Sequence, residues 1–84
     1  MPDPEIDNNI RRLRAEHAKM TQQELADKIG VTRQTVNAIE LGKYSPSLEM
    51  AFRIALVFRL PIDQVFSYRG KLRVSIPATP FFRE

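Results

Sequence analysis

The sequence has 84 residues, the length of one small domain, which excludes a two-domain enzyme. It has no cysteine and one histidine, so disulfides are excluded and soft ligands are too few for a zinc or haem site. The net charge is +3, yet residues 10–84 carry 13 basic against 7 acidic residues. Most of these cations are Arg, which favours a nucleic-acid partner, with a merely solvated charged surface as the alternative.

The sequence shows no targeting or catalytic signal. No apolar run approaches the roughly 18 residues of a membrane span, and the acidic start MPDPEID has no apolar core of a signal peptide. We therefore expect a cytoplasmic protein that does not contact a membrane. No nucleophile–base pair, phosphate loop or metal cluster is present, so we expect neither an enzyme nor a cofactor.

Two helices are predicted in the first thirty residues. Asp7, Asn8 and Asn9 supply capping oxygens for a first helix that ends near His17. The order Thr-Gln-Gln-Glu at 21–24 is a capping box, which opens a second helix. Gly30 follows its last apolar residue, where a helix ends most easily in a left-handed conformation.

Further helices follow after a turn at residues 30–32. Thr32 caps a third helix over about 33–41, which Gly42 ends. Ser47 caps a fourth helix that stops before Pro61, and residues 62–66 are expected to form one more short helical turn. The predicted fold is all-α: a compact five-helix domain over residues 1–66, followed by a C-terminal extension over 67–84.

The second and third helices have the spacing of a helix-turn-helix, at residues 22–41. Ala26 allows their close approach, Val31 fills the turn, and Val36 and Ile39 seat the third helix on the core. The remaining side chains at the start of the third helix are mostly polar. A helix that enters the major groove N-terminus first presents such residues to base edges.

Residues 10–66 resemble the XRE family, the helix-turn-helix proteins of the Cro and phage-repressor type. The most specific part is TQQELADKIGVTRQTVNAIELGKYSPSL, where the capping box, the small and apolar seats and the final E-x-G-K-x-x-P-S run occur in the family's order. The resemblance implies a lambda-repressor-like fold that binds double-stranded DNA.

The resemblance also implies which side chains would read bases. They lie along the third helix: Thr32, Arg33, Gln34, Thr35, Asn37 and Ala38. Arg33 suits guanine, whereas Gln34 and Asn37 suit adenine. Ala38 departs from the longer polar residue that many relatives carry, so it can at most contact a thymine methyl group. Plain solvated surface is the alternative interpretation of the polar side chains.

Other positions match residues that hold the DNA backbone or the domain itself. Gln22, Lys43 and Tyr44 match phosphate contacts, although Tyr44 could equally pack on the fourth helix. Arg11 could reach a flanking phosphate, but simple solvation is the more economical interpretation. Arg14 and Glu40 match a structural ion pair that joins the first helix to the end of the third.

The fourth helix is unusually apolar, with ten apolar residues among the thirteen from Leu48 to Leu60. Its expected inward stripe comprises Leu48, Ala51, Phe52, Ile54, Ala55 and Phe58. Met50 and Val57 extend past one edge of this stripe, and Leu56 extends past the other. A helix that is apolar nearly all round needs a second cover.

The C-terminal extension offers that cover. Leu72, Val74 and Ile76 alternate with polar residues, which predicts a half-buried β-strand over 71–76. We expect the strand to pair with its mate in a homodimer or to fold over the fourth helix. A frayed tail is the alternative.

The most economical function is a sequence-specific DNA-binding transcriptional regulator, most simply a repressor that binds a palindromic operator as a homodimer. One such domain covers too few base pairs to be selective in a genome, so two copies are expected. The alternative is an antitoxin-type or protein-interaction member of the same family, which clamps a partner protein through the fourth helix and the extension.

Overall fold

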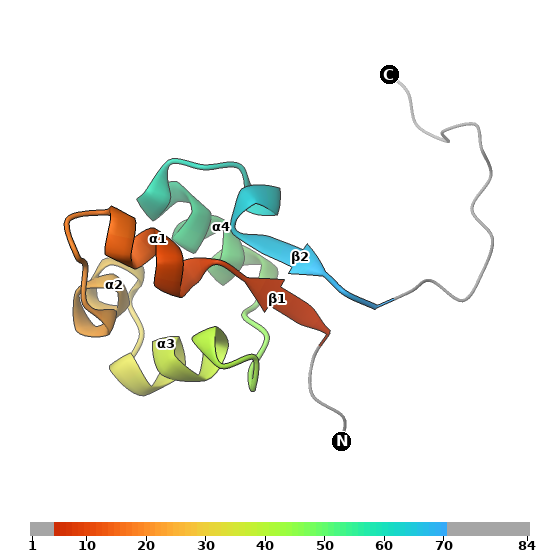
Figure 1. The fold of residues 1–84 in the computed structure, drawn as a ribbon. Helices are drawn as coiled ribbons and strands as arrows, with labels where there is room; N and C mark the ends of the chain where they lie inside the picture. Colours follow the sequence, from red (N-terminus) through yellow and green to blue (C-terminus); the bar gives the residue numbers. More distant parts are fainter. Residues whose placement is uncertain (1–4, 71–84) are drawn as a thin grey trace.

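The computed structural model describes residues 5–70. The expected strand at 71–76, with Leu72, Val74 and Ile76, therefore lies outside the described residues. In chain order the elements are β1 (Ile6–Asn8), α1 (Ile10–Glu16), α2 (Gln22–Ile29), α3 (Arg33–Glu40), α4 (Leu48–Phe58), the 3-10 turn η1 (Ile62–Gln64) and β2 (Phe66–Tyr68) (Figure 1). The helices form the body, and β1 and β2 lie side by side where they project from it.

Side-chain caps set the starts of three helices, as predicted. The Thr21 hydroxyl accepts from the Glu24 amide at 3.0 Å, while the Glu24 carboxylate accepts from the Thr21 amide at 2.8 Å, which completes the capping box. Thr32 caps α3 and Ser47 caps α4 in the same way. Each cap satisfies amides that have no partner within the helix, so these starts follow directly from local sequence.

The start of α1 differs from the expectation in detail. Asn9 is the cap residue, but its side chain makes no capping bond. Instead the Asn8 Oδ1 atom accepts from the Ile10 amide at 3.0 Å. Asn8 can do so because it lies at the end of β1, two residues before the helix begins.

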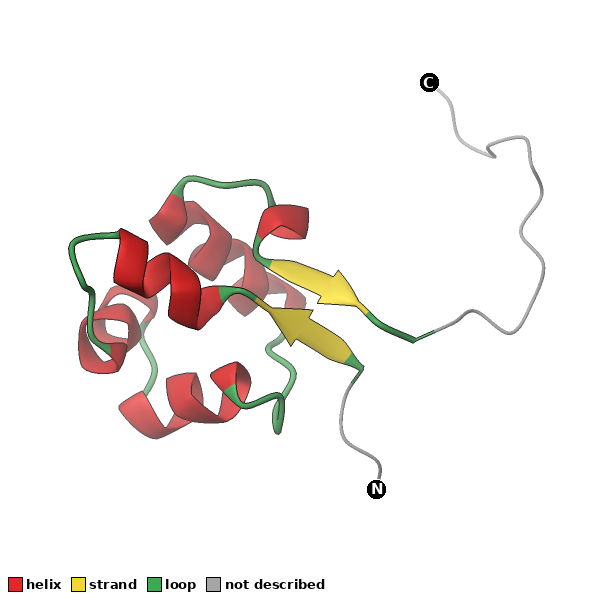
Figure 2. Cartoon of the chain, in the orientation of Figure 1, coloured by secondary structure: helices red, strands yellow, loops and turns green. Residues whose placement is uncertain are grey.

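The all-α expectation is wrong at the end of the domain, where a small sheet follows the expected short helical turn. Residues 62–66 contain a single 3-10 turn, and Phe66 already begins β2. β1 and β2 pair antiparallel, with Ile6 opposite Tyr68 and Asn8 opposite Phe66 (Figure 2). Strands of three residues are too short to show an alternating pattern, and their pairing joins segments about sixty residues apart. The fold is therefore mostly helical, with four α-helices and a small sheet.

The sheet contains residues on both sides of position 66, where the domain was expected to end. Beyond β2, the Arg69 amide donates to the Glu5 carbonyl oxygen at 2.9 Å, and the Arg69 guanidinium pairs with the Asp7 carboxylate. The extension expected from residue 67 thus begins within the folded part. The two ends of the described chain are held together by these contacts.

One face of every helix contributes to a single core. Its buried residues are Ile10, Leu13, Leu25, Ala26, Ile29, Val36, Ile39, Ala51, Ile54, Ala55, Phe58 and Val65. All of them are apolar, and no side-chain polar atom buried within residues 5–70 lacks a hydrogen-bond partner. No helix in this range combines the length and apolar content that crossing a bilayer requires.

The buried face of α4 is narrower than predicted. Leu48 and Phe52 were expected to point inward, but they are 70% and 54% exposed. Ala51, Ile54, Ala55 and Phe58 suffice to fill the core, and Met50 and Val57 pack against it from one edge. Since Leu48, Phe52 and Leu56 are spaced by four residues, they form a second apolar stripe on the solvent side. We call these three residues the α4 stripe.

Candidate nucleic-acid interface

The turn between α2 and α3 is tightly closed. Gly30 has a φ of 80°, and the amides of Gly30 and Val31 both donate to the Ala26 carbonyl oxygen, at 2.8 and 3.0 Å. Ala26 is fully buried, so no larger side chain separates the two helices. Val36 and Ile39 bury the inner face of α3, which leaves its other face outward.

The outward face of α3 carries the residues predicted to read bases. Arg33, Gln34 and Asn37 are exposed, as is the cap residue Thr32. Thr35 and Ala38 are half-buried at the margin. The Thr32 and Thr35 hydroxyls lie 3.0 Å apart and hydrogen-bond each other, and the Thr32 hydroxyl also accepts from the Thr35 amide to cap the helix. Of the predicted base-reading residues within α3, the exposed ones are thus those with the longer polar side chains.

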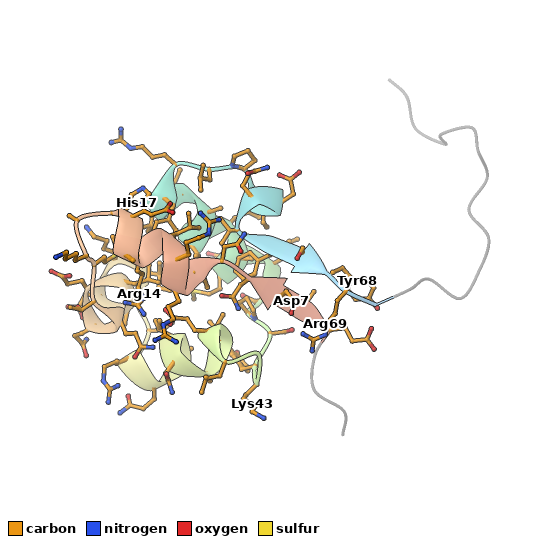
Figure 3. All side chains as sticks on the ribbon, in the orientation of Figure 1. Asp7, Arg14, His17, Lys43, Tyr68 and Arg69 are labelled. Atoms are coloured by element: carbon orange, nitrogen blue, oxygen red, sulfur yellow. The ribbon has the colours of Figure 1, made fainter. Side chains whose placement is uncertain are left out.

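The Arg14 side chain links α1, on which it lies, to the end of α3 and to the loop before α2 (Figure 3). Its Nε and Nη2 atoms donate to the two Glu40 carboxylate oxygens at 2.6 and 3.0 Å, and its Nη1 atom donates to the Met20 carbonyl oxygen at 2.8 Å. The side chains of Arg14 and Glu40 are only 16% and 7% exposed. The hydrogen bonds that Arg14 donates to the Glu40 carboxylate raise the pKa of the Arg14 guanidinium, with burial acting in the opposite direction. The two predicted members of the structural pair are thus brought together.

Gln22 joins the same group from the start of α2. Its Nε2 atom donates to Asn37 Oδ1 at 3.1 Å and to Glu40 Oε1 at 3.2 Å. The side-chain amide therefore points toward α3. With Arg11, Arg14 and Leu41, these residues line a polar hollow of about 310 Å³. Arg11, the predicted phosphate contact on α1, is one of these lining residues and is exposed.

The loop after α3 holds the other predicted phosphate contacts. Its backbone is closed by the Lys43 amide, which donates to the Ala38 carbonyl oxygen at 2.9 Å, and by Gly42 at a φ of 75°. Lys43 extends from this loop (Figure 3), and Tyr44 is 52% exposed. The loop lies directly beyond the C-terminal end of α3, so its side chains flank the exposed face of the helix.

Two supporting residues were not found by sequence reasoning. The Asn8 Nδ2 atom donates to the Ile39 carbonyl oxygen at 2.9 Å, which ties β1 to the end of α3. The Arg53 Nη1 atom donates to the Ile29 carbonyl oxygen at 3.2 Å, and its Nη2 atom pairs with Glu49. The spacing of four between Glu49 and Arg53 was a visible signal for their pair. No local pattern indicates the contacts with Ile39 or Ile29, which lie far away in sequence.

Comparison with known proteins settles the family. The helix-turn-helix family profile matches residues 10–65, about two thirds of the chain. The chain is an XRE-type helix-turn-helix protein. An HTH-type transcriptional regulator of Methanocaldococcus jannaschii is 51% identical over 61 residues, which are 73% of this chain and 91% of that protein. This result confirms the resemblance seen in the sequence.

Two other similarities bear on the fold and on the class of protein. The cryptic phage CTXphi transcriptional repressor RstR of Vibrio cholerae is 38% identical over 60 residues, which cover 71% of this chain and 53% of RstR. A crystal structure of a Bacteroides fragilis protein, assigned as DNA-binding, superposes with a TM-score of 0.66 at 26% identity. The superposition covers 74% of this chain and 98% of the other. The helix-turn-helix protein described here thus shares its helical body with a solved fold.

Proposed function

We propose that the chain is a sequence-specific DNA-binding transcriptional regulator that inserts α3 into the major groove. The observation that carries this proposal is the outward face of α3, where Arg33, Gln34 and Asn37 are exposed while Val36 and Ile39 anchor the helix. Long polar side chains on a rigid helix are what base edges require. The helix-turn-helix relatives named as transcriptional regulators support the same function.

The exposed residues would divide into two roles. Arg33 would donate to guanine O6 and N7, and Gln34 would pair with adenine, so these two, together with Asn37, would set the sequence preference. Lys43, Tyr44, Arg11 and the backbone amide of Gln22 would contact phosphates and set the register of the protein on the duplex. Thr32 and Thr35 would support the first turn of α3 through their mutual hydrogen bond.

Selection of bound duplexes from a random pool tests both roles. Arg33→Ala should relax the preference at one base pair, where a good bidentate contact contributes about 1–3 kcal/mol of discrimination. Lys43→Ala should weaken all duplexes alike and should lower the log–log salt slope by about 1. If Lys43→Ala changed the base preference and Arg33→Ala did not, the assignment of roles would be wrong.

We further propose that two copies act together as a homodimer on a palindromic operator. One domain buries only about 600–1,000 Å² on DNA, which gives little selectivity. Two copies with recognition helices about 34 Å apart would read half-sites one helical turn apart. The similarity to RstR, a repressor, favours repression as the regulatory outcome.

The α4 stripe is the surface we propose for the contact between copies. Leu56, at its end, is 76% exposed. The stripe borders an apolar hollow of about 360 Å³ lined by Ile6, Ser45, Pro46, Leu48, Ala51, Ile62 and Phe66. Exposed apolar surface of this kind is typical of an interface. We propose that the alternating residues of 71–76 join this contact. Met50 and Val57, which the sequence also suggested for this contact, are half-buried against the core of their own chain.

Sedimentation equilibrium tests the dimer. The full chain should be dimeric at tens of micromolar, and Leu56→Glu should be monomeric with unchanged helical content, because the substituted position is exposed. Ala15→Glu, which likewise replaces an exposed apolar residue of a helix, is the matched control and should remain dimeric. A monomeric full chain at these concentrations would show that the dimer proposal is wrong.

The α4 stripe also favours a second candidate function, the clamping of a partner protein as antitoxins do. In that case the full chain would be monomeric alone and would form a heterodimer with the product of a neighbouring small reading frame. The Leu56→Glu variant would lose the heterodimer. The sedimentation experiment therefore separates the two candidates.

A further inference from the structure

The hydrogen bonds that link Arg14, Glu40 and Gln22 impose an orientation on the side-chain amide of Asn37. An ionised carboxylate only accepts hydrogen bonds, so Glu40 requires that Gln22 present its Nε2 group, at 3.2 Å, and not its oxygen. Glu40 is itself held by two bonds from Arg14. The orientation of the Gln22 amide thus follows from the charge of its neighbour.

The second hydrogen of the same Nε2 group fixes the orientation of the Asn37 side-chain amide. It donates to Asn37 Oδ1 at 3.1 Å, so Asn37 must turn its oxygen toward Gln22. Its Nδ2 group then faces away from the α2–α3 junction. Within residues 5–70 the Asn37 Nδ2 atom has no hydrogen-bond acceptor, and Asn37 is exposed.

We propose that the hydrogen-bonded series Arg14–Glu40–Gln22, which we call the relay, restricts the Asn37 side chain to donating hydrogen bonds in the major groove. The inference rests on the proposed function, and it changes the base that Asn37 would prefer. Adenine is read bidentately by an amide that accepts from N6 and donates to N7. Asn37 cannot turn its oxygen toward the groove without losing the bond from Gln22. The base opposite it should therefore be one that offers only acceptors, with guanine O6 and N7 the best match.

Gln22 is then a positioning residue for specificity. Removing its polar group releases the Asn37 amide, which can rotate and accept from adenine N6. Gln22→Met keeps the length of the side chain without donors or acceptors, so it isolates this effect. The variant should bind more weakly overall as well, because Gln22 lies beside the proposed phosphate contacts, so the informative quantity is the ratio between bases and not the affinity.

Duplex selection on the full chain measures that ratio. At the base pair where Asn37→Ala abolishes the preference, the wild type should select guanine, and Gln22→Met should raise the adenine-to-guanine ratio at least about fivefold. Gln23→Met, one residue along on the exposed side of α2, should leave the ratio unchanged. A wild type that selects adenine at this position, or a Gln22→Met ratio equal to that of the wild type, overturns the inference.

Amide exchange in the free protein tests the orientation without DNA. The Gln22 side-chain NH2 protons are both bonded, so NMR should show them exchanging about tenfold more slowly than those of the exposed Gln34. The Asn37 NH2 protons should exchange as fast as those of Gln34. Protected Asn37 protons with unprotected Gln22 protons would overturn the relay, whatever the DNA result. If exchange agrees but no duplex is selected, the proposed function fails and the base preference fails with it.

Discussion

Glu40 is the residue that joins α1 and α2 to the end of α3, and we call this contact the junction. Its carboxylate accepts from Arg14 on α1 and from Gln22 on α2, although it lies at the end of α3 itself. At 7% exposure it has lost nearly all of its hydration. Such a group is tolerated only where charged donors replace water, which is what the Arg14 guanidinium provides.

Glu40→Gln should therefore lower the free energy of unfolding by about 2 kcal/mol, because the part-buried Arg14 guanidinium loses its counter-charge while the shape of the side chain is kept. Urea denaturation measures the loss. Glu16→Gln is the matched control, since Glu16 pairs with Arg12 at 3.1 Å but both side chains are more than half exposed. An exposed pair contributes little, so the control should lose less than about 0.5 kcal/mol. Equal losses in the two variants would contradict this view of the junction.

Residue-level roles were predictable from the sequence only in part. The exposed face of α3 follows from the spacing of Val36 and Ile39, since everything off that apolar face must point outward. The pairing of Arg14 with Glu40 came from the family resemblance alone. The bond from Gln22 to Asn37 could not be foreseen, because it depends on how close α2 and α3 approach and on how three side chains share their hydrogen bonds.

At the scale of elements, the helices follow from their ends. Caps at Thr21, Thr32 and Ser47 and the glycines at 30 and 42 place the boundaries within about one residue of those observed. These signals are strictly local, so sequence suffices for them. The sheet depends instead on the pairing of residues near 7 with residues near 67, and two strands of three residues carry no pattern strong enough to predict it.

Gly30→Ala should destabilise the protein by about 1–2 kcal/mol through the backbone alone. Gly30 has a φ of 80°, a conformation in which a Cβ atom is strained. The added Cβ would meet only Arg53 Nη1 at 3.9 Å, so no clash contributes.

Thermal unfolding followed by circular dichroism measures this loss. Gly42→Ala is the comparison, because Gly42 has a φ of 75° and open space around its Cβ position, and it should lose a similar amount. Gly30→Asn should lose less, since Asn tolerates the left-handed region better than Ala. If Gly30→Ala were as stable as the wild type, the turn would not depend on left-handed geometry.

At the scale of the whole molecule, β1 connects the two ends of the described residues, near 5 and near 69, to α3. The strand pairs with β2 on one side, and through Asn8 it reaches the Ile39 carbonyl oxygen, which also accepts from the Gly42 amide at 3.0 Å. The C-terminal turn of α3 is thus held by a residue more than thirty positions earlier. A segment that looked like a helix cap in the sequence therefore also supports the proposed DNA-binding surface.

Asn8→Ala removes both side-chain bonds of this residue, to Ile39 and from Ile10, so the free energy of unfolding should fall by about 2 kcal/mol. Asp7→Ala, which removes an exposed pair with Arg69, should cost less than about 0.5 kcal/mol. Hydrogen exchange locates the effect: the amides of Gly42 and Lys43 should exchange faster in Asn8→Ala relative to those of α2, whereas uniform acceleration over the chain would mean that Asn8 supports only global stability.

Because the loop carrying Lys43 begins at these amides, loosening them should also reduce affinity for DNA without changing the base preference set by Arg33.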